Sequence, residues 1–278
     1  MPGDIFKRAS RSLGIKIKRK KFRSFNVAKD FLDCKIEEGI PVGCQVGVFH
    51  LPYFPKEYRF HFNAHNIIVY GKDNDRYYVS DPVMETVTSL TASELEDVRF
   101  ARGPLAPKGH IYYPENVPQI DEHKIKKAIV IALRKNSWWM SRVPVSIIGS
   151  SGFNYTGKKI RKWPTQIGVQ KSGLNLGQIV RMQEEIGTGG GGFRFIYAAF
   201  LEKASEILQD GRLLEISDNL TKSGDLLRAS AVRMAQIYKG RNTSQSHFNE
   251  VADGFDEIAE LEQRTFMKLY KMKFNIDA

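Results

Sequence analysis

The sequence predicts an α+β fold, in which a small antiparallel sheet domain at residues 1–116 is followed by an all-α domain at residues 117–278. Three observations support this. Runs with the alternation or the β-branched composition of strands occur mainly in the first part of the chain. Two of these runs flank a polar turn, as in a β-hairpin. After the linker-like segment Pro114–Ile120, apolar residues recur at helical spacing.

The sheet domain contains short elements whose ends are marked by capping and turn residues. Asn26 is expected to cap its first helix and Gly39 to end it, and Thr91 and Glu94 form the pattern of a capping box. The elements expected here are a strand near Ile15–Phe22, a helix at Val27–Glu38, a strand at Ile40–Phe49, hairpin strands at Asn66–Tyr70 and Arg76–Ser80, a helix from Thr91 to about Ala101, and a strand at His110–Tyr113.

The second domain is expected to consist of helices joined by short connections. A break is predicted near Pro164, because proline interrupts helical hydrogen bonding. The helices are predicted at Glu122–Trp138, Thr156–Val169, Leu174–Ile186, Phe193–Gln209, Leu213–Tyr238 and His247–Tyr270.

Composition places the chain among globular proteins. Its 278 residues are enough for two ordinary domains, and 42% hydrophobic with 26% charged residues is typical of soluble proteins. No apolar run approaches the ~18 residues of a spanning helix, so we expect no membrane span. The two cysteines have no spacing pattern, which argues against a disulfide framework and favours the cytoplasm.

The net charge of +11 is concentrated at the N-terminus. Residues 1–23 hold nine Lys and Arg against one acid, and the remaining 33 basic and 30 acidic residues nearly balance. A basic segment attracts phosphate backbones or anionic lipids. However, Ile15 and Ile17 alternate with lysines, as in an edge strand protected by charge. The segment also lacks the interleaved aromatic residues of a nucleic-acid reader, so we expect no nucleic-acid partner.

His65 and Asp81 are the candidate catalytic residues, and the predicted hairpin brings them together. With the polar turn centred on Asp73, these two residues lie opposite each other, at a Cβ separation of about 5 Å. The same register pairs Ile67 with Val79 and Val69 with Tyr77. An aspartate that binds one ring nitrogen fixes the tautomer and leaves the other nitrogen free to take a proton. The alternative is a histidine at a strand entrance and an aspartate that begins a turn.

A metal site is not expected at His61-x-x-x-His65. On a helix this spacing brings two ligands together, but in an extended chain the two residues lie about 13 Å apart. No cluster of cysteine or carboxylate residues completes a ligand set.

Neither cysteine is in a position that activates a thiolate. Cys34 lies late in its helix, where the helix dipole opposes a negative charge, and it shares a face with Val27 and Phe31 at core spacing. Cys44 alternates with valines of a predicted strand. Both are therefore predicted to be buried structural residues. No serine lies in a G-x-S-x-G nucleophile motif.

The glycine run Gly187–Gly192 formally contains G-x-G-x-x-G. A dinucleotide site requires a strand before this motif, whereas a helix is predicted here, so a turn between two helices is favoured. In a second interpretation, the free N–H groups of the following helix bind an anion beside Arg194. Gly189, Gly190 and Arg194 are therefore candidate residues for binding a substrate or a carrier protein.

The whole sequence resembles the family of the butirosin-biosynthesis acyltransferase BtrH. The hairpin stretch and the glycine-run stretch are its more specific parts. The matching stretches are GIPVGCQVGVFHLPYFP at 39–55, HFNAHNIIVYGKDNDRYYVSDP at 61–82, SELEDVRF at 93–100 and EEIGTGGGGFRFIYAAFLEKASEI at 184–207.

The resemblance implies a papain-like N-terminal domain followed by a helical domain of unknown function. In such proteins a cysteine takes an acyl group from a carrier-protein thioester and passes it to an amine. The implied partners are thus an acyl carrier protein and an amine acceptor, without a cofactor; a homo-oligomer is also possible. His65 resembles the general base of the family, and Asp81 resembles the acid that orients it.

The chain departs from the family at the nucleophile. The family places its cysteine in a segment before the part matched by Met1–Ile17, and neither Cys34 nor Cys44 aligns with it. We therefore expect a shortened enzyme with little or no turnover. Two alternatives are a papain-like cysteine peptidase or amidase and a non-catalytic module that binds a carrier protein.

Overall fold

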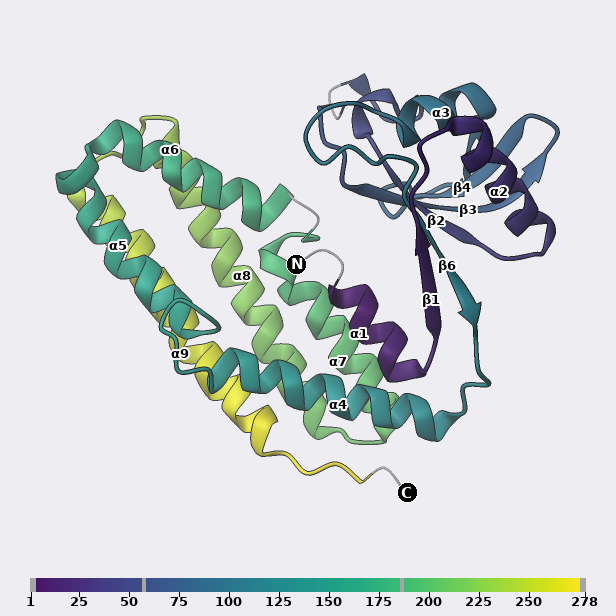
Figure 1. Cartoon of the computed structure of the whole chain (residues 1–278). Coiled ribbons are helices and arrows are strands. Elements are labelled where there is room, and N and C mark those ends of the chain that lie inside the picture. The colour runs from purple at the N-terminus through teal and green to yellow at the C-terminus, as the bar shows by residue number, and fades with distance from the viewer. Residues whose placement is uncertain (1–3, 57–58, 186–187, 276–278) are drawn as a thin grey trace. The chain divides into compact units, whose positions relative to one another are not determined.

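The computed structural model describes residues 4–56, 59–185 and 188–275. The chain forms two compact units, Met1–Ile120 and Asp121–Ala278. The described part of the first unit contains a six-stranded antiparallel sheet with helices, and that of the second unit is helical (Figure 1). The predicted α+β class is confirmed.

The sheet has the strand order β1-β6-β2-β3-β4-β5, and each neighbouring pair is antiparallel. Strand β1 is an edge strand, as its alternating lysines indicate. The strand β5 was not predicted, because its sequence Thr-Ser-Leu-Thr is short and carries a single aliphatic residue. The strands are β1 (Lys16–Lys20), β2 (Val42–Val46), β3 (His65–Asp73), β4 (Arg76–Ser80), β5 (Thr88–Thr91) and β6 (Ile111–Asn116).

One face of the sheet is covered by α2 (Phe25–Glu37) and α3 (Ala92–Arg99). Buried residues of both helices join alternate residues of the strands in a single hydrophobic core. The predicted capping box of α3 is present, because Thr91 and Glu94 each bond the backbone N–H of the other. Helix α2 begins after Ser24 rather than Asn26, so Asn26 lies inside its first turn. The preceding helix, α1 (Asp4–Leu13), was not predicted.

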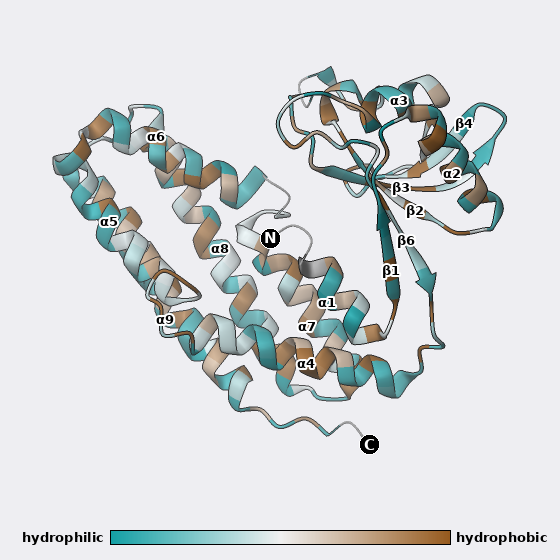
Figure 2. Cartoon of the chain, in the orientation of Figure 1, coloured by the Kyte–Doolittle hydropathy of each residue, from teal (hydrophilic) through white to brown (hydrophobic). Residues whose placement is uncertain are grey.

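The second unit is built on long amphipathic helices, and Figure 2 shows hydrophobic and hydrophilic residues interspersed along them. Two hydrophobic cores hold them together. The expected break near Pro164 is wrong, because α5 continues to Ile167 and ends at Gly168, which has a φ of 81°. The helices are α4 (Glu122–Ser141), α5 (Ser151–Ile167), α6 (Val169–Val180), the π-helical turn η3 (Arg181–Glu185), η4 (Gly191–Phe193), α7 (Arg194–Leu208), α8 (Arg212–Tyr238) and α9 (Gln245–Lys271).

Among the described residues, no helix combines the length and the apolar character needed to cross a membrane.

Replacing Gly43 by alanine is expected to lower the free energy of unfolding of the sheet unit by about 1–3 kcal/mol. A Cβ at Gly43 would lie 2.1 Å from Cε2 of Tyr112, its partner on β6, so the ring would have to move. Gly71→Ala is the matched control: its Cβ would lie 3.2 Å from a ring atom of Tyr78, which is 38% exposed and free to shift. Urea unfolding followed by circular dichroism measures both effects, and equal losses would contradict the prediction.

Candidate active site

Two polar side chains meet at the end of the hairpin. His65 is the first residue of β3 and pairs with Val46 of β2, while Asp81 directly follows β4. Nε2 of His65 lies 2.7 Å from Oδ2 of Asp81. Only 13% of the His65 side chain and 0% of the Asp81 side chain are exposed. An imidazole and a carboxylate are thus joined by a short, buried hydrogen bond.

The register that produces this contact differs from the predicted one by two residues. Val69, rather than Ile67, pairs with Val79, and the predicted pairing of Val69 with Tyr77 is also wrong. By extension of the same register, Asp81 is a diagonal neighbour of His65 and not its direct partner.

The cause of the displacement is the shape of the hairpin. The turn lies at Asn74 and Asp75, between the paired residues Asp73 and Arg76, and Asn74 has a left-handed φ of 52°. A register shift between Val69 and Gly71 accommodates an extra residue. A displacement of two residues keeps each side chain on the same face of the sheet, because side chains alternate with a period of two. The contact between the imidazole and the carboxylate therefore survives the change of register.

The Asp81 carboxylate accepts three hydrogen bonds from the surrounding protein. In addition to His65, the Tyr53 hydroxyl donates to Oδ2 at 3.0 Å and the backbone N–H of Val83 donates to Oδ1 at 2.9 Å. Burial raises the pKa of Asp81, but the hydrogen bonds from His65 and Val83 outweigh it, so the pKa lies below its ordinary value. Asp81 is therefore ionised at neutral pH.

Tyr53 and Phe54 complete the surroundings of the pair. Burial is the main cause, and the charge of Asp81 the second, that raises the pKa of Tyr53 far above its ordinary value. Its hydroxyl therefore stays protonated and donates. The Phe54 ring meets the His65 ring edge-on, at a centroid distance of 5.7 Å. Sequence reasoning missed both residues, because they lie in the loop after η1 (Val48–His50), far from Asp81 along the chain. Their contacts are purely tertiary.

The carboxylate also defines the protonation of the His65 ring. An ionised carboxylate only accepts hydrogen bonds, so Nε2 carries a proton. In the neutral ring, Nδ1 is then the nitrogen that is free to accept one. This is the arrangement of a general base held by an acid that orients it.

Cys44 lies on the same face of the sheet as His65, and it is fully buried. It pairs with Ile67, next to the pair formed by Val46 and His65. Burial raises the pKa of its thiol, and the Arg99 guanidinium opposes this only partly. The prediction of a buried Cys44 is confirmed.

Cys34 is exposed on α2, so the prediction that it is buried is wrong. Helix α2 contacts the core through Ala28 and Leu32, while Val27 is 57% exposed. Val27 and Cys34 therefore lie on the exposed side of the helix, although Phe31, which was predicted to share their face, packs against the core. A hydrogen bond from Sγ to the Glu38 carboxylate raises the pKa of the Cys34 thiol. Neither cysteine is an activated thiolate.

The predicted ligand-binding residues of the second unit lie in the turn before α7 and, for Arg194, at the first residue of this helix. Gly189 and Gly190 both have positive φ, and Gly187 lies outside the described residues. The N–H of Gly190 donates to Oγ1 of Thr188. Arg194 donates to both carboxylate oxygens of Glu262, at 2.8 and 2.9 Å. The protein itself thus uses the Gly190 N–H and three of the five N–H groups of Arg194.

The side chains of His61 and His65 contact different residues. The His61 ring stacks on Phe49 at a centroid distance of 4.1 Å, whereas His65 binds Asp81. Within the described ranges, no three His, Cys, Asp or Glu residues are grouped so that they could hold a metal ion.

Comparison with known families assigns both parts of the chain. Residues 1–82 match the family described as Butirosin biosynthesis protein H, N-terminal, and residues 93–269 match the family described as Domain of unknown function (DUF4872). No curated protein matches the chain. The DUF4872 match begins in α3 and includes β6, so it extends across both compact units.

Replacing Asp81 by asparagine is expected to destabilise the sheet unit by about 1–3 kcal/mol at pH 7. Because the pKa of Asp81 is lower in the folded state, its stabilising effect is present above the unfolded pKa of about 4 and is lost as the pH falls through the folded value. The difference between wild type and D81N should therefore shrink at low pH.

Urea unfolding at several pH values between 7 and 3 measures this difference. Asp73→Asn, at an exposed position of the same hairpin, is the control and should show no such trend. A gap between wild type and D81N that stays constant over this range would show that the carboxylate charge is not what stabilises the site.

Proposed function

Since this chain belongs to the DUF4872 family and carries the N-terminal domain of the butirosin biosynthesis protein H family, we propose that it acts in acyl transfer from a carrier-protein thioester to an amine. The observation that carries the proposal is the hydrogen bond of 2.7 Å between His65 and the buried, ionised Asp81. Such a pair is suited to moving protons between sulfur and nitrogen groups.

In the proposed reaction, Nδ1 of His65 takes the proton of a thiol, and Asp81 stabilises the imidazolium that forms. The thiolate attacks the carbonyl carbon of the donor thioester, the bond from this carbon to the carrier sulfur breaks, and the imidazolium returns the proton to the departing sulfur. An amine then attacks the new thioester and gives its proton to His65. The amide forms as the second carbon–sulfur bond breaks, and the imidazolium of His65 returns its proton to the departing thiolate.

The attacking thiol is not supplied well by either cysteine of this chain. Cys44 is fully buried in the core, and Cys34 donates a hydrogen bond to Glu38. The pKa of both thiols is raised. We therefore propose that the 278-residue chain by itself shows little or no turnover, although it retains the base and the acid that orients it.

The lack of an activated thiol among Cys34 and Cys44 favours a second candidate, a non-catalytic module that binds a carrier protein. Tight binding of an acyl carrier protein, without transfer even when a thiol is supplied, would support this candidate over the enzyme. Peptides tested in parallel with acyl thioesters distinguish the acyltransferase and the binding module from a peptidase of the same fold, because only the peptidase would cleave the peptides.

Supplying a thiol tests the proposed base directly. We expect the chain to accelerate exchange of the acyl group between the octanoyl thioester of N-acetylcysteamine and added 2-mercaptoethanol, and His65→Gln to reduce this acceleration by about 100-fold. Asp81→Asn should reduce it by a smaller factor. Asp73→Asn is the control outside the site and should leave the rate unchanged.

The cysteine variants test the assignment of the nucleophile. The rate of exchange with added thiol should be the same in wild type, Cys34→Ala and Cys44→Ala. Efficient transfer without added thiol that is abolished in Cys44→Ala would instead identify Cys44 as the nucleophile and refute its structural role.

A further inference from the structure

The helical unit contains a pocket with a volume of about 470 Å³, within the range of ligand-binding pockets. Side chains from all of its long helices except α7 supply an apolar wall, and α7 supplies Arg194. The apolar side chains of the wall are Met140, Ile147, Phe153, Ile179, Leu227 and Phe255. The mouth is apolar as well, because Ile147 and Met182 are each 60% exposed. Such a lining favours a ligand with an apolar body.

Two irregular segments of backbone border this pocket. The π-helical turn η3 contributes Met182 and Gln183. The glycine turn contributes Gly192, and the next residue, Phe193, has a left-handed φ of 71° although it is not glycine. Both features cost backbone energy and are concentrated at functional sites. Their meeting at one pocket indicates that its shape is selected for binding.

The polar group of the pocket is the guanidinium of Arg194, whose positive charge is balanced by a neighbouring carboxylate. Nε and Nη2 of Arg194 donate to the Glu262 carboxylate, which is fully buried, and Nη1 donates to the Gly192 carbonyl at 2.6 Å. A guanidinium has five N–H groups, so two have no acceptor within the described parts of the chain. About 19% of the Arg194 side chain remains exposed.

The pairing with Glu262 decides what Arg194 recognises. Because the carboxylate balances the charge, a second anion would gain little attraction and would lose its hydration in an apolar pocket. A neutral oxygen acceptor can still receive the two remaining N–H groups. The site therefore suits a carbonyl oxygen better than a carboxylate.

We propose that this pocket binds a neutral, mainly apolar ligand with one carbonyl acceptor, of the class of an acyl chain in ester, thioester or amide linkage, with its carbonyl directed at Arg194. The proposal stands on the helical unit alone and does not depend on His65 or Asp81.

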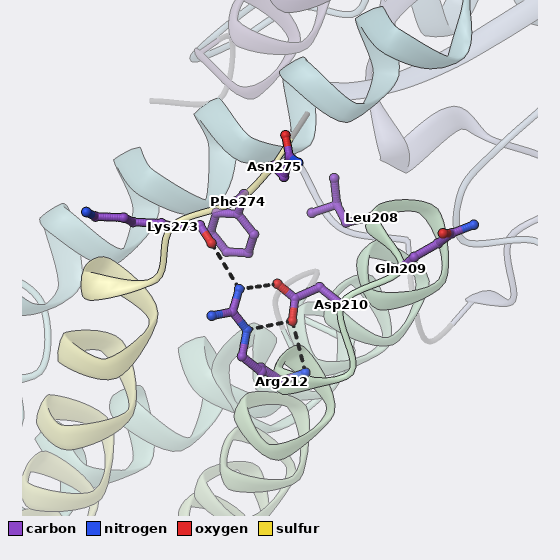
Figure 3. Close-up of a pocket in the computed structure, with 7 residues that line it drawn as sticks. All are labelled: Leu208, Gln209, Asp210, Arg212, Lys273, Phe274 and Asn275. Carbon is purple, nitrogen blue, oxygen red and sulfur yellow. Dashed lines mark hydrogen bonds and ion pairs between the residues drawn. The ribbon is translucent and has the colours of Figure 1, made fainter. Parts of the chain in front are cut away.

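A second pocket of the same unit lacks these features. Its volume is about 350 Å³, and it lies beside the turn between α7 and α8. Figure 3 shows Arg212 held by both oxygens of Asp210 and by the carbonyl of Lys273. Its main polar groups thus bind one another.

Displacement of a fluorescent probe tests the proposal. The neutral dye N-phenyl-1-naphthylamine is bound to the full chain at pH 8 and is displaced by methyl octanoate or by octanoate. We expect the ester to bind at least about tenfold more tightly than the anion, equivalent to about 1.4 kcal/mol. Ester that fails to displace the dye, or octanoate that binds equally well, overturns the proposal.

A matched pair of variants locates the binding. Met182→Asp places a charge at the mouth of the pocket, and Val232→Asp places one on α8 outside the lining, where the residue is likewise 60% exposed. Met182→Asp should weaken the ester by about tenfold, and Val232→Asp should leave it unchanged. Equal effects would show that binding occurs elsewhere. Because both residues are exposed, both variants are expected to fold.

Glu262→Gln tests the charge argument. It removes the balancing carboxylate, so octanoate should bind more tightly than to wild type while the ester changes less. Ester preference that stays at the wild-type ratio in a folded variant would refute the role of the ion pair. The Met182 and Val232 pair decides the location of the site even where the Glu262 variant does not fold. Since the thiol-exchange assay depends on His65 in the other unit, failure there leaves this result unaffected.

Discussion

The hydrogen bond between His65 and Asp81 is the interaction on which the proposed chemistry depends. A carboxylate with no exposed surface would ordinarily be held neutral, since burial disfavours charge. Here the imidazole, the Tyr53 hydroxyl and the backbone N–H of Val83 surround it with donors and keep its pKa low. The same three contacts connect the start of β3, the end of β4 and the loop after η1. One ionised group thus both orients the ring and fastens three segments of the sheet unit.

The sequence predicted this contact through a register that was wrong in detail. Alternation of apolar residues determines which face a side chain occupies, and this information is present in each strand separately. The register depends on the turn, which is centred between Asn74 and Asp75, with Asn74 in a left-handed conformation, rather than on Asp73. The compensating irregularity near Tyr70 lies beside Gly71, which the sequence predicts to be part of the turn rather than of the strand. The face was therefore predictable, whereas the exact partner was not.

The two cysteines show that burial could be predicted from the sequence in a strand but not in a helix. Cys44 lies in a strand where every second residue is a valine, and its burial follows from that pattern. In α2, apolar residues occupy more than one possible stripe, so spacing alone allowed Cys34 to be placed in the core. The sheet selects the stripe of Ala28 and Leu32, and this choice is a property of the packed unit. Tyr53, which reaches Asp81 from a distant loop, was missed for the same physical reason.

Among the described residues, two buried carboxylates, Asp81 and Glu262, have partners that give them different capabilities. Asp81 binds an imidazole, whose second ring nitrogen can accept and donate a proton, so this pair can take part in proton transfer. Glu262 binds a guanidinium, which stays protonated, so this pair can only present donors in a fixed geometry. The first pair lies in the segment that matches the Butirosin biosynthesis protein H, N-terminal family, and the second borders an apolar pocket in the helical unit. We therefore propose proton transfer in the first unit and ligand recognition in the second, because the two carboxylates have these different partners.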